Sequence, residues 1–198
     1  VFLQKAKEMH APILFADALP EVELESDLKG IYQNENKPTA FYALQQLPEA
    51  LKPSLEEIKA GFANVVKNTG LQGRWQILSE NPKVICDTGH NEDGIKLVLQ
   101  QLAQTPHKKL HMVWGMVNDK NIVPILAMLP KNAVYYFTKP NLPRGLDEKI
   151  LFAEAQNFGL AGKSYPNVAG AIEAAKTNAQ KDDVIFIGGS TFVVAEAV

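Results

Sequence analysis

Short apolar runs of strand length alternate with amphipathic segments of helix length from residue 73 to the end of this 198-residue chain. Alternating strands and helices of these lengths form a mostly parallel sheet with right-handed crossovers. The pattern therefore predicts an α/β fold, a Rossmann-like sheet flanked by helices. Strands are expected at residues 75–78, 84–86, 110–115, 134–137, 163–165 and 184–187, and helices at 92–104, 122–129, 146–158, 168–179 and after Ser190.

The first 72 residues lack this alternation. A helix is expected at residues 2–9, the apolar run 13–16 is typical of a strand, and residues 32–38 look like a turn-rich entry to a helix at 39–47. Ser54, followed by Glu57, predicts a capping box at the start of a further helix. Two good helices and at most two weak strands are too few to bury a core. We therefore divide the chain into an incomplete domain, residues 1–72, and a second domain, residues 73–198.

Composition narrows the classes of function. The chain carries 20 basic and 22 acidic residues, with no basic stripe and no apolar run of membrane-spanning length, so we expect no binding to nucleic acid or membrane. Its single cysteine, Cys86, lies in an apolar run and suits a reducing compartment, so we expect a cytoplasmic protein. We interpret Cys86 as a small core residue.

A polar cluster, Asp87-Thr88-Gly89-His90-Asn91, follows the strand expected at 84–86. In open α/β sheets, ligands bind at the carboxyl ends of strands. A carboxylate there can accept hydrogen bonds from ribose hydroxyls or help hold a metal, and an imidazole can donate to a phosphate. Asp87 and His90 are therefore candidate site residues. The alternative is that Asp87 and Asn91 only cap the following helix.

Four further motifs accompany this cluster in order: GRWQIL at 73–78, GMVNDKN at 115–121, PNLPRG at 140–145 and IGGSTF at 187–192. The series resembles the C-terminal domain of the folylpolyglutamate synthase and dihydrofolate synthase family, in the Mur ligase superfamily. That family's pattern is roughly G-R-W/F, D-x-A-H-N, G-M-x-x-D-K, P-R-G and a final G-S. Gly89 stands where the family usually has alanine, a small-for-small change. The resemblance runs from about Leu71 to the end and is weaker before it.

The resemblance implies that residues 1–72 are the last part of a central ATPase domain, with Asn36 near the adenine of ATP. The alternative for Asn36 is a turn or cap. The resemblance also places Arg74 on the ATP phosphates, a role suited to the bidentate donors of arginine, and Asp87 on the nucleotide. His90 is a catalytic candidate that supports a phosphate or simply satisfies its loop.

Three more candidates lie in later loops. Lys120, in Asn118-Asp119-Lys120, is a candidate catalytic residue that closes over the site, although a charged tripeptide in a loop is usually only solvated. Arg144 is a candidate for binding an acidic group such as the glutamate substrate. Ser190 follows two glycines at a helix start, where backbone N–H groups favour an anion; such glycines also serve close packing.

The resemblance implies a ligase that uses ATP and Mg²⁺ to join L-glutamate to folate or dihydropteroate through an acyl phosphate. We expect a monomer. Residues 157–164, NFGLAGKS, are close to a phosphate loop, but Asn157 replaces the first glycine and the segment follows a helix instead of preceding one. We reject this match, so we expect no ligase activity from these residues alone and no metal site among them. The alternatives are a Mur-type ligase that adds an amino acid to a UDP-sugar, and a non-catalytic Rossmann-like nucleotide-binding module.

Overall fold

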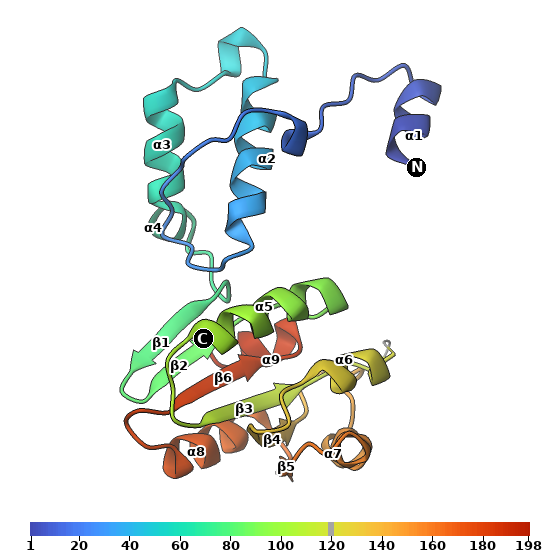
Figure 1. Cartoon of the computed structure of the whole chain (residues 1–198), viewed down its shortest axis with the longest axis vertical. Coiled ribbons are helices and arrows are strands. Elements are labelled where there is room, and N and C mark those ends of the chain that lie inside the picture. The colour runs from blue at the N-terminus through green and yellow to red at the C-terminus, as the bar shows by residue number, and fades with distance from the viewer. Residues whose placement is uncertain (119–120) are drawn as a thin grey trace. The chain divides into compact units, whose positions relative to one another are not determined.

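The computed structural model describes residues 1–118 and 121–198 (Figure 1). The chain forms two compact units. The first unit comprises Val1–Asp27 and Tyr32–Thr69, and the second unit comprises Leu28–Ile31 and Gly70–Val198. None of the described helices is long and apolar enough to cross a membrane.

The second unit is built on a six-stranded sheet with the order β1-β2-β6-β3-β4-β5. β1 is antiparallel to β2, and every other neighbouring pair is parallel. This confirms the predicted α/β fold with a mostly parallel sheet. The strands are β1 Gln76–Glu80, β2 Lys83–Cys86, β3 Leu110–Gly115, β4 Val134–Thr138, β5 Gly162–Tyr165 and β6 Val184–Gly188.

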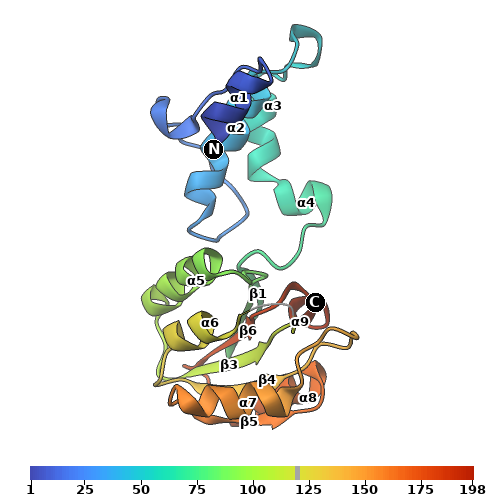
Figure 2. The same cartoon turned by 90° about the vertical axis from the view of Figure 1, so that its right-hand side faces the viewer.

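Helices cover both faces of this sheet (Figure 2). α5 (Glu92–Gln104), α6 (Val123–Met128) and α7 (Glu148–Asn157) bury one set of strand side chains, including Ile85, Trp114 and Phe186. α8 (Val168–Asn178) and α9 (Thr191–Ala195) bury the alternate set, including Cys86 and Ile187. Successive side chains of a strand point to opposite faces. The central strands are therefore buried on both sides, as their continuous apolar sequences predict.

Local sequence signals place these helices as expected. Asn91 caps α5 by accepting a hydrogen bond from the Gly94 N–H at 2.8 Å, and Asp147 caps α7 by accepting from Lys149 and Ile150. Pro124 lies in the first turn of α6, where a missing N–H costs no intrahelical bond. The helices predicted for this unit are therefore confirmed within a few residues at each end.

The first unit is helical in its described elements: α1 Phe2–Glu8, η1 Ala16–Ala18, α2 Gln33–Gln45, η2 Glu49–Leu51, α3 Leu55–Ala63 and α4 Val65–Thr69. The predicted capping box is confirmed at α3. The Glu57 N–H donates to the Ser54 hydroxyl oxygen, and the Ser54 N–H donates to the Glu57 carboxylate at 2.8 Å. This pair satisfies two donors at the start of the helix.

Two predictions for the first unit are wrong. The apolar run 13–16 forms no strand, because none of the strands among the described residues lies beside it to share backbone hydrogen bonds, and Ile13, Leu14 and Phe15 are exposed. The expected turn at 32–38 is instead helical, since α2 begins at Gln33 and contains Pro38. Pro38 lies inside α2 and has no N–H to donate to the carbonyl four residues earlier, and the helix nevertheless continues to Gln45.

Candidate functional site

Four loops meet at the carboxyl end of the sheet. β2, β6, β3 and β4 are neighbouring parallel strands, so the segments that follow them lie at the same end. These segments are residues 87–91, 188–190, 115–118 and 139–146, which we call the carboxyl-end loops. The Asp87 N–H donates to the Ile187 carbonyl at 3.1 Å, which joins the first loop to β6. Asp87, Ser190 and Arg144, separated widely in sequence, therefore belong to one region.

Asp87 is buried and holds the turn that precedes β1. Asp87 is 1% exposed, and its Oδ2 accepts from the Trp75 N–H and its Oδ1 from the Gly89 N–H, each at 2.7 Å. Trp75 has a positive φ of 47°, a strained conformation for an aromatic residue. The alternative that Asp87 caps α5 is wrong, because Asn91 makes that bond. Asp87 instead ties the turn at 73–75 to the loop after β2.

Thr88 contacts two of the candidate site residues, Arg74 and His90. The Arg74 Nη1 donates to the Thr88 hydroxyl oxygen, and the His90 Nδ1 lies 3.0 Å from the Thr88 carbonyl oxygen. The Thr88 N–H donates to the Gly73 carbonyl at 2.9 Å. Arg74 and His90 were predicted from the sequence as site residues but Thr88 was not, because a threonine in a polar loop carries no ligand signal. The only sequence feature that pointed to Thr88 was its position between Asp87 and His90.

Arg144 packs on a neighbouring helix. Its guanidinium carbon lies 4.8 Å from the centroid of the Phe192 ring, a cation–π contact, and its carbonyl accepts from the Asn118 N–H at 2.9 Å. Val117 and Gly145 form an antiparallel bridge beside this bond. The loops that follow β3 and β4 are therefore joined to each other, and Arg144 links them to α9.

Ser190 is 2% exposed and caps α9, because its Oγ accepts from the Phe192 N–H at 3.2 Å. A ligand role for Ser190 stays a prediction. Asn36 lies in α2 of the first unit, where its Nδ2 donates to the Gln33 Oε1 at 3.1 Å. Its predicted place beside adenine likewise stays a prediction. Lys120 lies outside the described residues.

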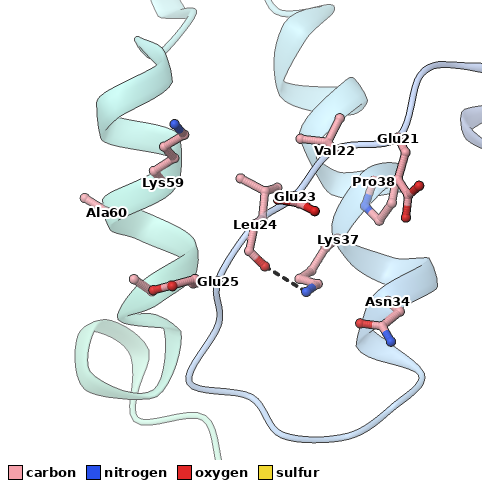
Figure 3. A pocket seen from close by; sticks show the side chains of 11 residues that line it. Glu21, Val22, Glu23, Leu24, Glu25, Asn34, Lys37, Pro38, Lys59 and Ala60 are labelled. Atoms are coloured by element: carbon pink, nitrogen blue, oxygen red, sulfur yellow. Dashed lines mark hydrogen bonds between the residues drawn. The ribbon is translucent and has the colours of Figure 1, made fainter.

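A separate open cavity of about 850 Å³ lies within the first unit, between the segment 21–25 and the helices α2 and α3 (Figure 3). Glu21, Glu23, Lys37 and Lys59 contribute charged groups to its lining, and the Lys37 ammonium donates to the Leu24 carbonyl at 2.7 Å. Asn36 is not among the lining residues. This cavity therefore gives no support to the predicted adenine contact of Asn36.

Two further observations bear on the candidate chemistry. Within residues 1–118 and 121–198, no group of three or more His, Cys, Asp or Glu side chains is arranged to hold a metal ion. The phosphate-loop-like segment 157–164 runs from the end of α7 into β5, so it does not lead into a helix N-terminus. The segment 157–164 therefore lacks the strand–loop–helix order of a phosphate loop, as expected from the sequence.

Comparison with known proteins gives a consistent result. Residues 73–191 match the family model described as Mur ligase, glutamate ligase domain. The dihydrofolate synthase/folylpolyglutamate synthase of Escherichia coli (strain K12) is 32% identical over 165 residues, which cover 82% of this chain and 37% of that protein. The chain spans between 20% and 40% of the length of the folate-ligase relatives that it matches.

Solved structures give the same picture. The structure described as E. coli FolC in complex with DHPP and ADP has a TM-score of 0.71 and 31% identity, and the match covers 90% of this chain and 39% of that one. A bifunctional folylpolyglutamate synthase/dihydrofolate synthase with Mn, AMPPNP and L-glutamate bound has a TM-score of 0.70 and 26% identity, with 90% and 41% covered.

Proposed function

Because the chain belongs to the Mur ligase family through its glutamate ligase domain, we propose that it is the C-terminal part of an ATP-dependent ligase that joins L-glutamate to folate or dihydropteroate. The names of its relatives support this substrate class, and the ADP, AMPPNP and glutamate in the similar structures support the co-substrates. The UDP-sugar ligase and the non-catalytic nucleotide-binding module are less well supported, because relatives at 30% identity or more are named as folate ligases.

The observation that carries the proposal is the cluster of Arg74, Asp87 and Thr88 at the carboxyl end of the sheet, within the matched residues. In such a ligase, ATP phosphorylates the folate carboxylate, and the amine of glutamate then displaces phosphate from the acyl phosphate. Several anionic groups must approach one another, so fixed positive donors lower the barrier.

Each candidate has a role that follows from its chemistry. Arg74 offers paired N–H donors to the ATP phosphates. The two Asp87 oxygens accept backbone N–H groups at 2.7 Å, and a carboxylate oxygen has a second lone pair for a ribose hydroxyl. His90 supports a phosphate, and Lys120 closes over the site. Arg144 and Ser190 serve the acidic glutamate, and Asn36 serves the adenine.

Magnesium would neutralise phosphate charge when bound with ATP. As the family resemblance implies, we propose that its ligands lie mainly in the part of the longer protein that precedes these residues. We assign the phosphate loop to the same part. We further propose a cytoplasmic, monomeric enzyme.

A phosphate-release assay tests the proposal. The 198-residue chain and the longer protein are each given ATP, Mg²⁺, L-glutamate and either dihydropteroate or a reduced folate. The longer protein is expected to release phosphate only when glutamate and the pterin substrate are both present, and the chain alone is expected to release none. Clear turnover by the chain alone, or turnover of the longer protein that depends on a UDP-sugar, would contradict the proposal.

A further inference from the structure

Thr88 directs its backbone, methyl and hydroxyl groups at the turn that carries Arg74. Its N–H donates to the Gly73 carbonyl at 2.9 Å, and its hydroxyl oxygen accepts from the Arg74 Nη1. A Cβ added to Gly73 would lie 2.8 Å from the Thr88 Cγ2, so the methyl group packs directly on the glycine. Thr88 is 9% exposed. These contacts make it a largely buried support for the turn.

The backbone on each side of Arg74 is held in an unusual shape. Gly73 and Trp75 have φ values of 74° and 47°, both in the left-handed region. Asp87 holds the Trp75 N–H at 2.7 Å, and Thr88 holds the Gly73 carbonyl. The polypeptide therefore fixes the direction in which the Arg74 side chain leaves the backbone. The long arginine side chain still has several rotatable bonds, and immobilising it on a ligand has an entropic cost.

The Thr88 hydroxyl removes part of that cost. It accepts one of the five N–H donors of a guanidinium, and the other donors can form a bidentate pair with phosphate oxygens. A hydroxyl is neutral, so it orients the guanidinium without cancelling the positive charge that attracts phosphate. A carboxylate in the same place would form an ion pair and compete with the ligand.

We propose that Thr88 is a positioning residue that orients the Arg74 guanidinium for the ATP phosphates. This rests on the proposed function, in which Arg74 contacts those phosphates. The role requires the hydroxyl group and not the methyl group, which separates it from a purely structural packing role.

Kinetics of the longer ligase test this inference. Thr88→Val keeps the shape of the side chain and removes the acceptor, and we expect the KM for ATP to rise about tenfold, as for the loss of one hydrogen bond to a charged group. The KM for glutamate should stay within about twofold of the wild-type value, well inside the tenfold step. Thr88→Ser keeps the hydroxyl and should restore the KM for ATP.

Thr138→Val is the matched control. Thr138 ends β4 at the same end of the sheet and is fully buried, and its hydroxyl has no hydrogen-bond partner among the described residues. Removing that hydroxyl should leave the KM for ATP unchanged. A double-mutant cycle completes the test: in an Arg74→Ala background, Thr88→Val should add less than about a twofold change, because the group that it positions is gone.

Three outcomes would overturn the inference. The first is a KM for ATP in Thr88→Val that equals the wild-type value. The second is a rise in the KM for ATP on adding Thr88→Val to Arg74→Ala that is as large as in the wild-type background, which would mean that Thr88 acts only on the fold. The third is a longer protein without any ATP-dependent turnover, which would overturn the proposed function as well. An active wild type with an unaffected Thr88→Val variant would overturn the positioning role alone.

Discussion

Replacing Asp87 by alanine should lower the free energy of unfolding of the second unit by about 3 kcal/mol. The carboxylate is 1% exposed and accepts from the Trp75 N–H, which is buried, and from the Gly89 N–H, which is partly buried. Leaving the Trp75 N–H without an acceptor should cost about 2 kcal/mol of stability, and leaving the Gly89 N–H without one about 1 kcal/mol, because water reaches the Gly89 N–H more easily. Trp75, whose φ is positive, also loses this hydrogen bond from its N–H.

Urea unfolding followed by tryptophan fluorescence measures this change. Trp75 and Trp114 are the two tryptophans of the chain, and both lie buried in the second unit. Asp147→Ala is the matched control, since Asp147 also accepts two backbone N–H groups, at 2.9 and 3.2 Å, but at a solvent-accessible helix start. Its loss should cost about 1 kcal/mol. If Asp87→Ala costs no more than Asp147→Ala, the assignment of Asp87 as the residue that holds this turn is refuted.

Gly73→Ala should destabilise the chain more than Gly159→Ala in the same urea assay. Both glycines have a similar φ, 74° and 73°, but a Cβ added at 73 would lie 2.8 Å from two side chains, whereas one added at 159 would lie no closer than 4.0 Å to any. Equal losses of unfolding free energy would contradict this. Burial raises the pKa of the Cys86 thiol to about 12, so iodoacetamide at pH 8 should label it only in urea, and rapid labelling of the native chain would contradict this. Burial alone would raise the pKa of Asp183, but hydrogen bonds from two backbone N–H groups and the His111 imidazole hold it below its ordinary value. Its contribution to stability is therefore present above pH about 4 and is lost as the pH falls through the lowered pKa. The urea midpoint should therefore fall less steeply below pH about 4 in Asp183→Asn than in the wild type, and an equally steep fall in the variant would contradict this.

Most of the second unit was predictable because the apolar spacing within each helix and strand indicates the type of that element. The strand expected at 184–187 is β6, Val184–Gly188, and the apolar spacing of residues 92–104 marks α5 at both ends. The first unit was less predictable, because a strand needs a partner. The apolar run at 13–16 has the composition of a strand, but no strand in the described part of the chain pairs with it.

The positions of the candidate residues in the fold were predictable, but their contacts were not. The sequence predicted that Asp87 directly follows a strand, and it lies in the loop after β2; its role toward a ligand stays a prediction. Its bond to the Trp75 N–H spans 12 residues and depends on how the β1–β2 hairpin folds, which no local pattern specifies. Thr88 was missed for the same reason, since its role depends on Arg74, 14 residues away.

The most direct test of the central claim is calorimetric titration of the longer ligase with AMPPNP and Mg²⁺, and separately with adenosine. If Arg74 binds the phosphates, Arg74→Ala should weaken AMPPNP at least about tenfold and leave adenosine, which has no phosphates, unchanged. Lys83→Ala removes one positive charge at the opposite end of β2 and serves as the control. Unchanged AMPPNP affinity in Arg74→Ala, or an equal loss for adenosine, would contradict the claim.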